Sequence, residues 1–305
     1  MKYLSVAEVS DLWQISDRRI RVLCSEGRIE GAIKIGRNWS VPSDAKKPVD
    51  GRENIQKKYT GLEKDFSILD SLKKEIDGNR PFSKKLAESL HEKIIVEWTY
   101  NSNAIEGNTL TLSETKVVLE GITVGGKSMT EHLETVNHRE AILFIEDLIN
   151  GKEKLSEWNI KNIHGLILKE IDNKNAGKYR DENILISDAN HIPPKYFEVH
   201  SLMQKLINEY NYEWVDYHPV IRAVLLHGEF VKIHPFIDGN GRTARILLNF
   251  ELMRNGYVPI IFKQESRARY YDVLDEALTT MNYGPFIEMV AELELEAEKM
   301  WLSVI

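Results

Sequence analysis

The sequence predicts a mainly α-helical protein that carries a small N-terminal module of its own. From about residue 60 onward, apolar residues recur at helical spacing, and no stretch shows the strand–helix alternation of a parallel sheet. Residues 1–50 instead indicate two short helices and a hairpin. The polar stretch that follows is interrupted by Pro48 and Gly51, which is typical of a linker. We assign residues 51–60 to this linker.

Composition and charge limit the classes of function. The chain has 305 residues and a net charge of −7, which gives no overall reason to expect nucleic-acid or membrane binding. A single cysteine, Cys24, excludes an internal disulfide and suits a reducing compartment. The N-terminus lacks a signal-peptide pattern, and no apolar stretch approaches the roughly 20 residues of a membrane span. We therefore expect a soluble, cytoplasmic protein.

The first 50 residues are interpreted as a helix, a turn, a second helix and a hairpin. The first helix is expected at Val6–Trp13, the second from Asp17 onward, and the hairpin turn at Gly36. This order resembles the winged helix-turn-helix of excisionase-like and MerR-like DNA-binding modules. In such modules the second helix enters the major groove and the wing touches the DNA backbone.

The resemblance implies DNA contacts by four arginines of the second helix and the hairpin: Arg18, Arg19, Arg21 and Arg37. Residues 1–50 carry nine Lys and Arg against seven Asp and Glu, and this excess of +2 is small for a DNA-binding surface. The alternative is a module for protein contacts or dimerisation. Because one module would bind DNA weakly, we expect a homodimer that reads two half-sites.

The rest of the chain is expected to form one helical body, with a first helical region over residues 61–150. Helical spacing predicts helices around 66–72, 86–98, 117–119, 133–149, 160–168, 199–210 and 219–233. Residues 183–194 are an exception, because three apolar residues precede a polar turn and a double proline. This pattern favours a short β-hairpin, and a connecting loop is the alternative.

The most informative stretch reads His-Pro-Phe-Ile-Asp-Gly-Asn-Gly-Arg-Thr-Ala-Arg, residues 234–245. The apolar run after it predicts a helix that ends at Gly256. A glycine turn at a helix N-terminus is a ready anion site, and Arg242 and Arg245 share one helix face. Asp238 is suited to Mg²⁺, and His234 to accepting a proton. Taken one at a time, these residues indicate only a turn and a solvated helix surface. Their occurrence together in twelve positions indicates a nucleotide-binding site.

This stretch resembles the signature of Fic-domain proteins, most of which transfer AMP from ATP. Every fixed position of that signature is present. The resemblance implies a Fic-type helical core over residues 151–305, including the C-terminal helices, with ATP and Mg²⁺ as cofactors. It also implies that residues 183–194 form a β-hairpin, the flap, on which a target protein docks with a Ser, Thr or Tyr hydroxyl. Residues 177–180 match the lead-in to that flap.

The same resemblance assigns roles within the signature. His234 takes the proton of the target hydroxyl, Asp238 holds Mg²⁺, Arg242 neutralises the triphosphate and Arg245 binds the γ-phosphate. Asn240 also contacts phosphate through the glycine turn. Pro235 and Phe236 are interpreted as packing residues. The residues implied to contact the nucleotide are Ile184, Leu185, Ile186, Ser187, Asp238, Gly239, Asn240, Gly241, Arg242, Arg245 and Tyr270.

The adenine end of the site is implied by a second short match. Residues 267–271 match a family segment that walls the base, which points to Tyr270, whereas Tyr271 is expected to face the core. Leu278 stands where some relatives place a polar Asn. We therefore expect base recognition to rest more on apolar contact at this position.

Residues 102–108 resemble the family's inhibitory pattern Ser/Thr-x-x-x-Glu-Gly/Asn. They lie ahead of the signature, as in the class whose inhibitory helix is N-terminal, here around residues 95–108. The resemblance implies that Glu106, together with Ser102, reaches into the site and that Glu106 forms a salt bridge with Arg245. The alternative is an ordinary helix end with a glycine stop.

Three functional hypotheses follow. The first is a self-inhibited protein adenylyltransferase, in which Glu106 also directs water onto the AMP–protein bond and so supports deadenylylation. The second is a related enzyme with another donor, such as UTP or a phosphocholine carrier, although two arginines favour a triphosphate. The third is a DNA-binding regulator whose core chiefly senses ATP or modifies a partner protein.

Overall fold

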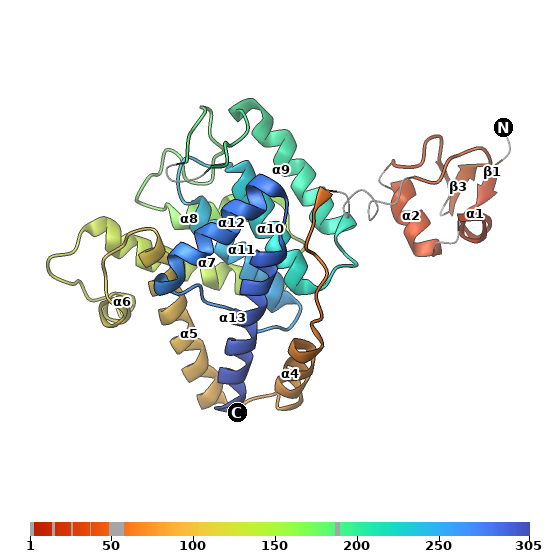
Figure 1. Ribbon diagram of the computed structural model, residues 1–305. Coiled ribbons are helices and arrows are strands. Elements are labelled where there is room, and N and C mark those ends of the chain that lie inside the picture. Colours follow the sequence, from red (N-terminus) through yellow and green to blue (C-terminus); the bar gives the residue numbers. More distant parts are fainter. Residues whose placement is uncertain (1–2, 14–15, 26, 37, 49–57, 187–189) are drawn as a thin grey trace. The chain divides into compact units, whose positions relative to one another are not determined.

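The computed structural model describes residues 3–13, 16–25, 27–36, 38–48, 58–186 and 190–305. The chain divides into two compact units, Met1–Lys57 and Lys58–Ile305 (Figure 1). Residues 49–57, which include most of the expected linker, lie outside the described residues. Each unit buries apolar side chains of its own, so each is considered by itself.

The N-terminal unit contains two helices and a small antiparallel sheet. The helices are α1 (Val6–Trp13) and α2 (Asp17–Ser25), and the strands are β1 (Tyr3–Ser5), β2 (Ile33–Ile35) and β3 (Asn38–Pro42). The strand order is β1-β3-β2, so the expected hairpin is extended by a strand that the sequence did not predict. One apolar cluster joins helices and sheet, with Val9, Ile20, Leu23 and Val41 at its centre.

The second unit is a helical body built around two central helices. Its helices are α4 (Ser67–Gly78), α5 (Lys84–Ile105), α6 (Leu112–Leu119), α7 (Met129–Asn150), α8 (Glu157–Ile167), α9 (Val199–Asn208), α10 (Pro219–Ile233), α11 (Asn240–Arg254), α12 (Arg267–Thr280) and α13 (Gly284–Leu302). Short 3₁₀ turns occur at Tyr196–Glu198 and Gln264–Ser266, and a π-helical turn at Glu209–Glu213 follows α9. Almost every side chain of α10 and α11 is buried, because α7, α8, α9, α12 and α13 pack around this pair.

Local sequence signals explain where several helices begin. At α6 and α7 the capping Thr111 and Ser128 accept a hydrogen bond from the backbone of Glu114 and Glu131, whose carboxylates bond back. This reciprocal capping satisfies N–H groups that lack partners inside the helix. Pro219 opens α10, where its missing N–H has no cost. The helical body is therefore assembled from elements whose limits are largely local.

The flap segment, residues 183–194, corrects one expectation. Its described residues, 183–186 and 190–194, contain no β-strand, so the predicted hairpin is wrong for them. Side chains join the two arms instead of a ladder: Arg180 donates to the carbonyls of Glu182 (2.9 Å) and Pro194 (2.6 Å). Asn190 is bonded through its backbone and its amide to Asp275. Two consecutive prolines also remove ladder donors from the second arm.

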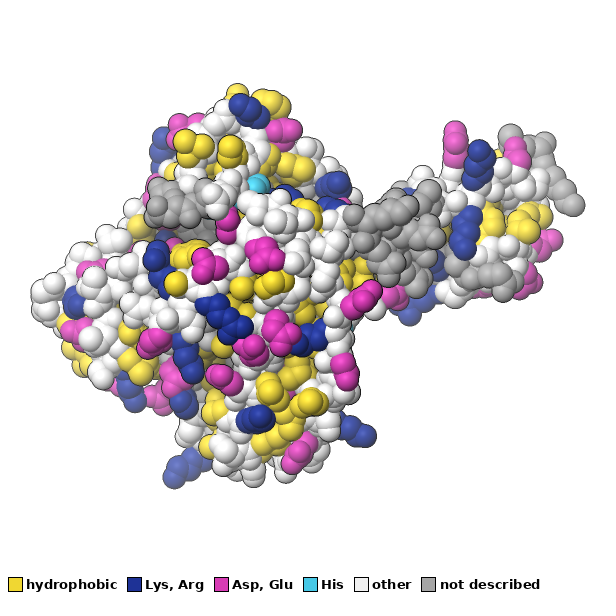
Figure 2. Space-filling view, viewed as in Figure 1, with side chains coloured by type: hydrophobic (Ala, Val, Ile, Leu, Met, Phe, Trp, Pro, Cys, Tyr) yellow, Lys and Arg dark blue, Asp and Glu magenta, His cyan; other side chains and the backbone are white. Residues whose placement is uncertain are grey.

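The surface charge of the helical body and the lengths of its helices indicate which partners it can bind. On the face shown in Figure 2, acidic and basic side chains are interspersed over the helical body without a continuous basic patch. Across the residues that the structure describes, each helix is too short or too polar to cross a lipid bilayer. This face therefore lacks the concentrated positive charge that nucleic-acid binding needs.

Candidate functional site

Residues 234–239 form the loop between the two central helices, and residues 240–245 are the first turns of α11. α10 ends at Ile233, and His234 adopts a left-handed conformation with φ +48°, which turns the chain out of the helix. Gly239, with φ +73°, precedes the first turn of α11, where glycine meets no steric penalty. α11 then ends at Arg254, and Gly256 (φ +84°) closes it: the Gly256 N–H donates to the Met253 carbonyl and the Tyr257 N–H to the Leu252 carbonyl. The loop is thus fixed between two buried helices.

Two side chains hold this loop in shape. The Asn240 amide accepts from the Phe236 backbone N–H (3.0 Å) and donates to the Phe236 carbonyl (2.9 Å). His164 of α8 stacks on Phe236, accepts from the Gly177 N–H at Nδ1 (2.9 Å) and donates from Nε2 to the Asp238 carbonyl (2.9 Å). Burial lowers the pKa of His164 to about 4, so its imidazole is neutral and can serve both partners near neutral pH.

These contacts orient Asn240, and close packing explains Gly241. The two bonds to Phe236 fix the Asn240 amide and leave one of its two N–H donors, together with the backbone N–H, for an anion. A Cβ on Gly241 would press against the Glu106 carboxylate and lie 3.2 Å from Arg245 Nη1. Glycine at this position therefore allows the carboxylate to approach the N-terminus of α11.

Arg242 is held by two carboxylates. Its Nη1 donates to Glu134 Oε1 (2.9 Å) and its Nη2 to Asp238 Oδ2 (3.3 Å). The Arg242 side chain is 4% exposed, whereas that of Asp238 is 66% exposed. Within the described ranges no three His, Cys, Asp or Glu side chains gather closely enough to hold a metal ion. A cation at Asp238 would need further oxygen ligands from a substrate.

Arg245 is buried and bound to the end of α5. Its Nε donates to Ser102 Oγ (3.1 Å), and its Nη2 donates to Ser102 O (2.8 Å) and Glu106 Oε1 (2.7 Å). Burial works to lower the pKa of Arg245, but the Glu106 carboxylate outweighs it and raises that pKa. Arg245 Nη1 has no hydrogen-bond partner within the described part of the chain. Ser102 and Glu106 therefore fix the position of this guanidinium.

The end of α5 is also an ordinary helix stop. α5 finishes at Ile105, Glu106 occupies the C-cap, and Gly107 follows with φ +99°. The stretch is thus both an ordinary helix end with a glycine stop and the source of the Glu106–Arg245 ion pair. The Glu106 side chain remains 29% exposed, because its carboxylate borders a cavity.

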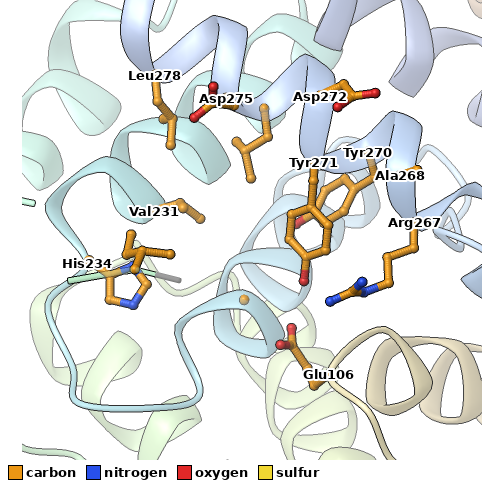
Figure 3. Close-up of a pocket in the computed structure, with 13 residues that line it drawn as sticks. Glu106, Val231, His234, Arg267, Ala268, Tyr270, Tyr271, Asp272, Asp275 and Leu278 are labelled. Atoms are coloured by element: carbon orange, nitrogen blue, oxygen red, sulfur yellow. The ribbon is translucent and has the colours of Figure 1, made fainter. Parts of the chain in front are cut away.

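A cavity of about 380 Å³ lies beside the loop (Figure 3). Its volume is within the range typical of small-molecule sites. Figure 3 shows Glu106 and His234 near the loop, with Asp275 and Leu278 on the opposite side of the space. The lining residues are Glu106, Ile186, Val231, His234, Gly241, Arg267, Ala268, Tyr270, Tyr271, Asp272, Leu274, Asp275 and Leu278.

His234 lines this cavity in a form that can accept a proton. Burial lowers the pKa of His234 to about 4, with the nearby Arg180 guanidinium as the second cause. The imidazole is therefore neutral near pH 7. Arg180 also donates from Nε to the His234 carbonyl (2.9 Å), which ties the base of the flap segment to the loop.

The family comparison agrees with this geometry. The model of the Fic/DOC family matches residues 154–252. This stretch contains the whole of the signature at residues 234–245. It is 36% identical over 245 residues to a protein adenylyltransferase Fic from Nematostella vectensis, covering 74% of this chain and 54% of the relative. The corresponding protein of Drosophila willistoni is 37% identical over 195 residues, or 63% and 39% of the two chains. The chain thus spans about half or less of these curated relatives.

Solved structures give the same result for the fold. A fragment of Fic-1 from C. elegans superposes with a TM-score of 0.72 at 28% identity, covering 78% of this chain and 71% of the fragment. A Fic domain containing signaling protein from Bacteroides thetaiotaomicron gives 0.71 at 29% identity and covers 77% and 96%. The helical body therefore has the Fic fold.

Tyr270 and Tyr271 of α12 both line the cavity, so the expectation for Tyr271 is corrected. Tyr271 was expected to face the core, but it points into the cavity above Glu106, with Arg267 over its ring (Figure 3). Tyr270 is the more deeply buried residue, and its hydroxyl pairs with His227 Nε2 (2.9 Å). Positions 267, 271, 274 and 278 share one helix face, and that face lines the cavity.

The described flap residues lie differently toward the cavity. Ile186 lines the cavity and Ile184 is half-buried, but the Leu185 side chain is 83% exposed and points to solvent. Alternation along an extended chain explains this difference. Ser187 lies outside the described residues. Sequence reasoning also missed His164 and Glu134, whose partners in the loop are 74 and 108 positions away, so no local spacing could indicate them.

Proposed function

We propose that this Fic-domain protein transfers AMP from ATP to a Ser, Thr or Tyr hydroxyl of a target protein, and that the described conformation is self-inhibited. The observation that carries the proposal is the Glu106–Arg245 ion pair at 2.7 Å on the wall of the cavity that His234 also lines. The names of the curated relatives, protein adenylyltransferases, support the reaction.

The nucleotide would lie along the cavity from the α11 N-terminus to α12. Its triphosphate would meet the backbone N–H groups of Asn240 and Gly241, the dipole of α11 and the guanidinium groups of Arg242 and Arg245. The adenine would lie toward Tyr271 and Leu278, where apolar side chains dominate the lining. The anionic and apolar parts of ATP thus match opposite ends of one space.

A magnesium ion fits the residues of the loop. Asp238 presents an exposed carboxylate next to Arg242, and Mg²⁺ commonly binds one or two carboxylates together with substrate phosphates. Bound there, the ion would offset negative charge on the phosphates. Asp238 would hold it, while Arg242 and Arg245 would bind the phosphate oxygens directly.

The protein's own residues account for the transfer. His234 accepts the proton of the target hydroxyl as its oxygen forms a bond to the α-phosphorus. The bond between the α-phosphorus and the bridging oxygen to the β-phosphate breaks, and pyrophosphate leaves. Arg242 and Arg245 stabilise the charge that develops on this leaving group. The contribution of the site is mainly positioning and electrostatic stabilisation.

Glu106 would restrain this reaction through Arg245. Its carboxylate takes the donor that the γ-phosphate requires, and it repels that phosphate. ATP would then bind with its α-phosphate out of line with the hydroxyl. The same carboxylate would orient a water for the reverse reaction, hydrolysis of the AMP–protein bond.

The target would dock beside the flap segment. Leu185 and Ile192 are exposed there although both are apolar, and the extended backbone of this segment offers hydrogen-bonding groups. Backbone pairing with an extended segment of the target would place a hydroxyl near His234 without strong sequence selection.

The reaction type is tested by the position of the label in ATP. Incubated with Mg²⁺ and target-containing lysate, a Glu106→Gly variant is expected to add protein label from α-labelled ATP beyond that of lysate alone, and no extra label from γ-labelled ATP. The reason is that pyrophosphate carries the γ-phosphate away. Transfer from γ-labelled ATP would instead indicate a kinase, and stronger transfer from α-labelled UTP would indicate another donor.

We also propose that the N-terminal unit binds DNA as part of a homodimer. On α2, Ile20 and Leu23 face the core, so Arg18 and Arg21 lie on the exposed face, and Arg19 is half-buried. This is the arrangement that a recognition helix needs. Arg37 lies outside the described residues.

DNA binding is expected to depend on salt and on α2. A duplex from upstream of the protein's own gene should bind the full chain, and Arg18→Ala with Arg21→Ala should reduce the slope of log K against log salt by about 2. Lys46→Ala, an exposed cation of the same unit, is the control and should change the slope less. Absence of salt-dependent binding would favour protein contacts.

A further inference from the structure

We propose that Glu134 is a positioning residue that joins the phosphate-binding Arg242 to the inhibitory turn, residues 102–108. This inference rests on the proposed function. Glu134 lies on α7 and uses both carboxylate oxygens: Oε1 accepts from Arg242 Nη1 (2.9 Å), and Oε2 accepts from Asn108 Nδ2 (2.8 Å). One side chain therefore contacts both the site and the turn that carries Glu106.

The inhibitory turn is anchored on α7 by two asparagines. Asn103 Nδ2 donates to the Glu134 carbonyl (3.2 Å), and Asn108 Nδ2 also donates to the Glu131 carbonyl (3.1 Å). α7 in turn packs against α5 and α11. Among these α7 groups, the Glu134 carboxylate also bonds Arg242. A movement of the turn can therefore reach Arg242 through Glu134.

The Glu134–Arg242 ion pair is largely shielded from solvent. The side chains of Arg242 and Glu134 are 4% and 18% exposed, so solvent screens their attraction weakly. Glu134 and Asp238 each use one N–H of Arg242, and Nε has no partner within the described residues. A guanidinium has five N–H donors, which leaves donors for phosphate while Glu134 fixes the orientation of the plane.

The two phosphate-binding arginines are thus each paired with a carboxylate that depends on the same turn. Glu106 belongs to the turn and binds Arg245; Glu134 bonds the turn through Asn108 and binds Arg242. A ligand that binds Arg242 changes the Glu134 carboxylate that Asn108 also bonds. Displacement of the turn removes the Asn108 bond and so changes how Glu134 holds Arg242. By linkage, ATP binding and release of the turn influence one another to the same extent.

The test uses the full chain in the Glu106→Gly background and the ATP analogue adenosine 5′-(β,γ-imido)triphosphate with Mg²⁺. Glu134→Gln keeps the shape and removes the charge, and we expect it to weaken analogue binding about tenfold in calorimetry. The KM for ATP in label transfer should rise to a similar extent, with little change in kcat, since Glu134 touches no reacting atom. Glu140→Gln on the same helix is the matched control.

Coupling to the turn is tested by a double-mutant cycle. Asn108→Ala should weaken analogue binding about threefold while Glu134 is present and have no further effect after Glu134→Gln. Unchanged binding in Glu134→Gln, or additive effects of the two substitutions, would overturn the proposal. Because calorimetry needs no transfer, a parent that binds the analogue but labels no protein would count against the proposed function alone.

Discussion

The double variant Glu106→Gly, His234→Ala is expected to transfer label from α-labelled ATP about 10² to 10⁴ times more slowly than Glu106→Gly alone. Loss of the imidazole removes the group that accepts the hydroxyl proton, whereas the phosphate contacts of Arg242 and Arg245 remain. Initial rates of protein labelling at saturating ATP measure this effect. The loss should therefore appear in kcat more than in the binding of ATP.

The control for this substitution is His91→Ala, which removes an exposed histidine of α5 that pairs with Glu146. It should leave the labelling rate unchanged. The pH profile provides a second readout, because the pKa of His234 is lowered to about 4 and a base works above its pKa. The acidic limb of kcat/KM should fall well below 6.5, and labelling that survives His234→Ala would contradict the role.

Glu106→Gly alone is expected to raise label transfer about 10- to 100-fold over the unmodified protein, the range of a charge-assisted hydrogen bond. The substitution frees the Arg245 guanidinium for the γ-phosphate and removes a like charge from its neighbourhood. Arg245 is still held by Ser102 through two hydrogen bonds, so its orientation is retained. Initial labelling rates of the two proteins give the ratio.

The chain offers a closely matched control in Glu120→Gly. Glu120 is the C-cap of α6 with φ −79° and ψ 0°, and Glu106 is the C-cap of α5 with φ −87° and ψ 2°. Each is followed by a glycine with positive φ. A general effect of a more flexible helix end would activate both variants, so equal rates for them would argue against a specific restraint by Glu106.

Local signals in the sequence predicted much of the fold. Pro219 to Ile233 forms a helix with the expected limits, and Gly256 ends α11 where expected, because capping and glycine stops depend on neighbouring residues. The signature likewise occupies one continuous stretch, a loop and the first turns of α11. Its place at the junction of α10 and α11 follows from that local pattern.

Features that depend on distant partners were not predictable in the same way. Tyr271 lines the cavity together with Tyr270, because the packing of α12 against α10 and α13 sets which of its side chains face that space. In the described residues of the flap segment there is no strand, and its second arm is held through the bond from Arg180 to the Pro194 carbonyl. His164 and Glu134 act across long sequence separations, which no spacing rule reports.

The central claim, that Glu106 and the γ-phosphate compete for Arg245, is tested most directly by the dissociation constants of ATP and ADP. They are measured by calorimetry with Mg²⁺ for the unmodified protein and for Glu106→Gly. The account predicts similar constants for both nucleotides in the unmodified protein, and ATP binding about tenfold tighter than ADP in the variant. An unchanged ratio of the two constants after Glu106→Gly would contradict it.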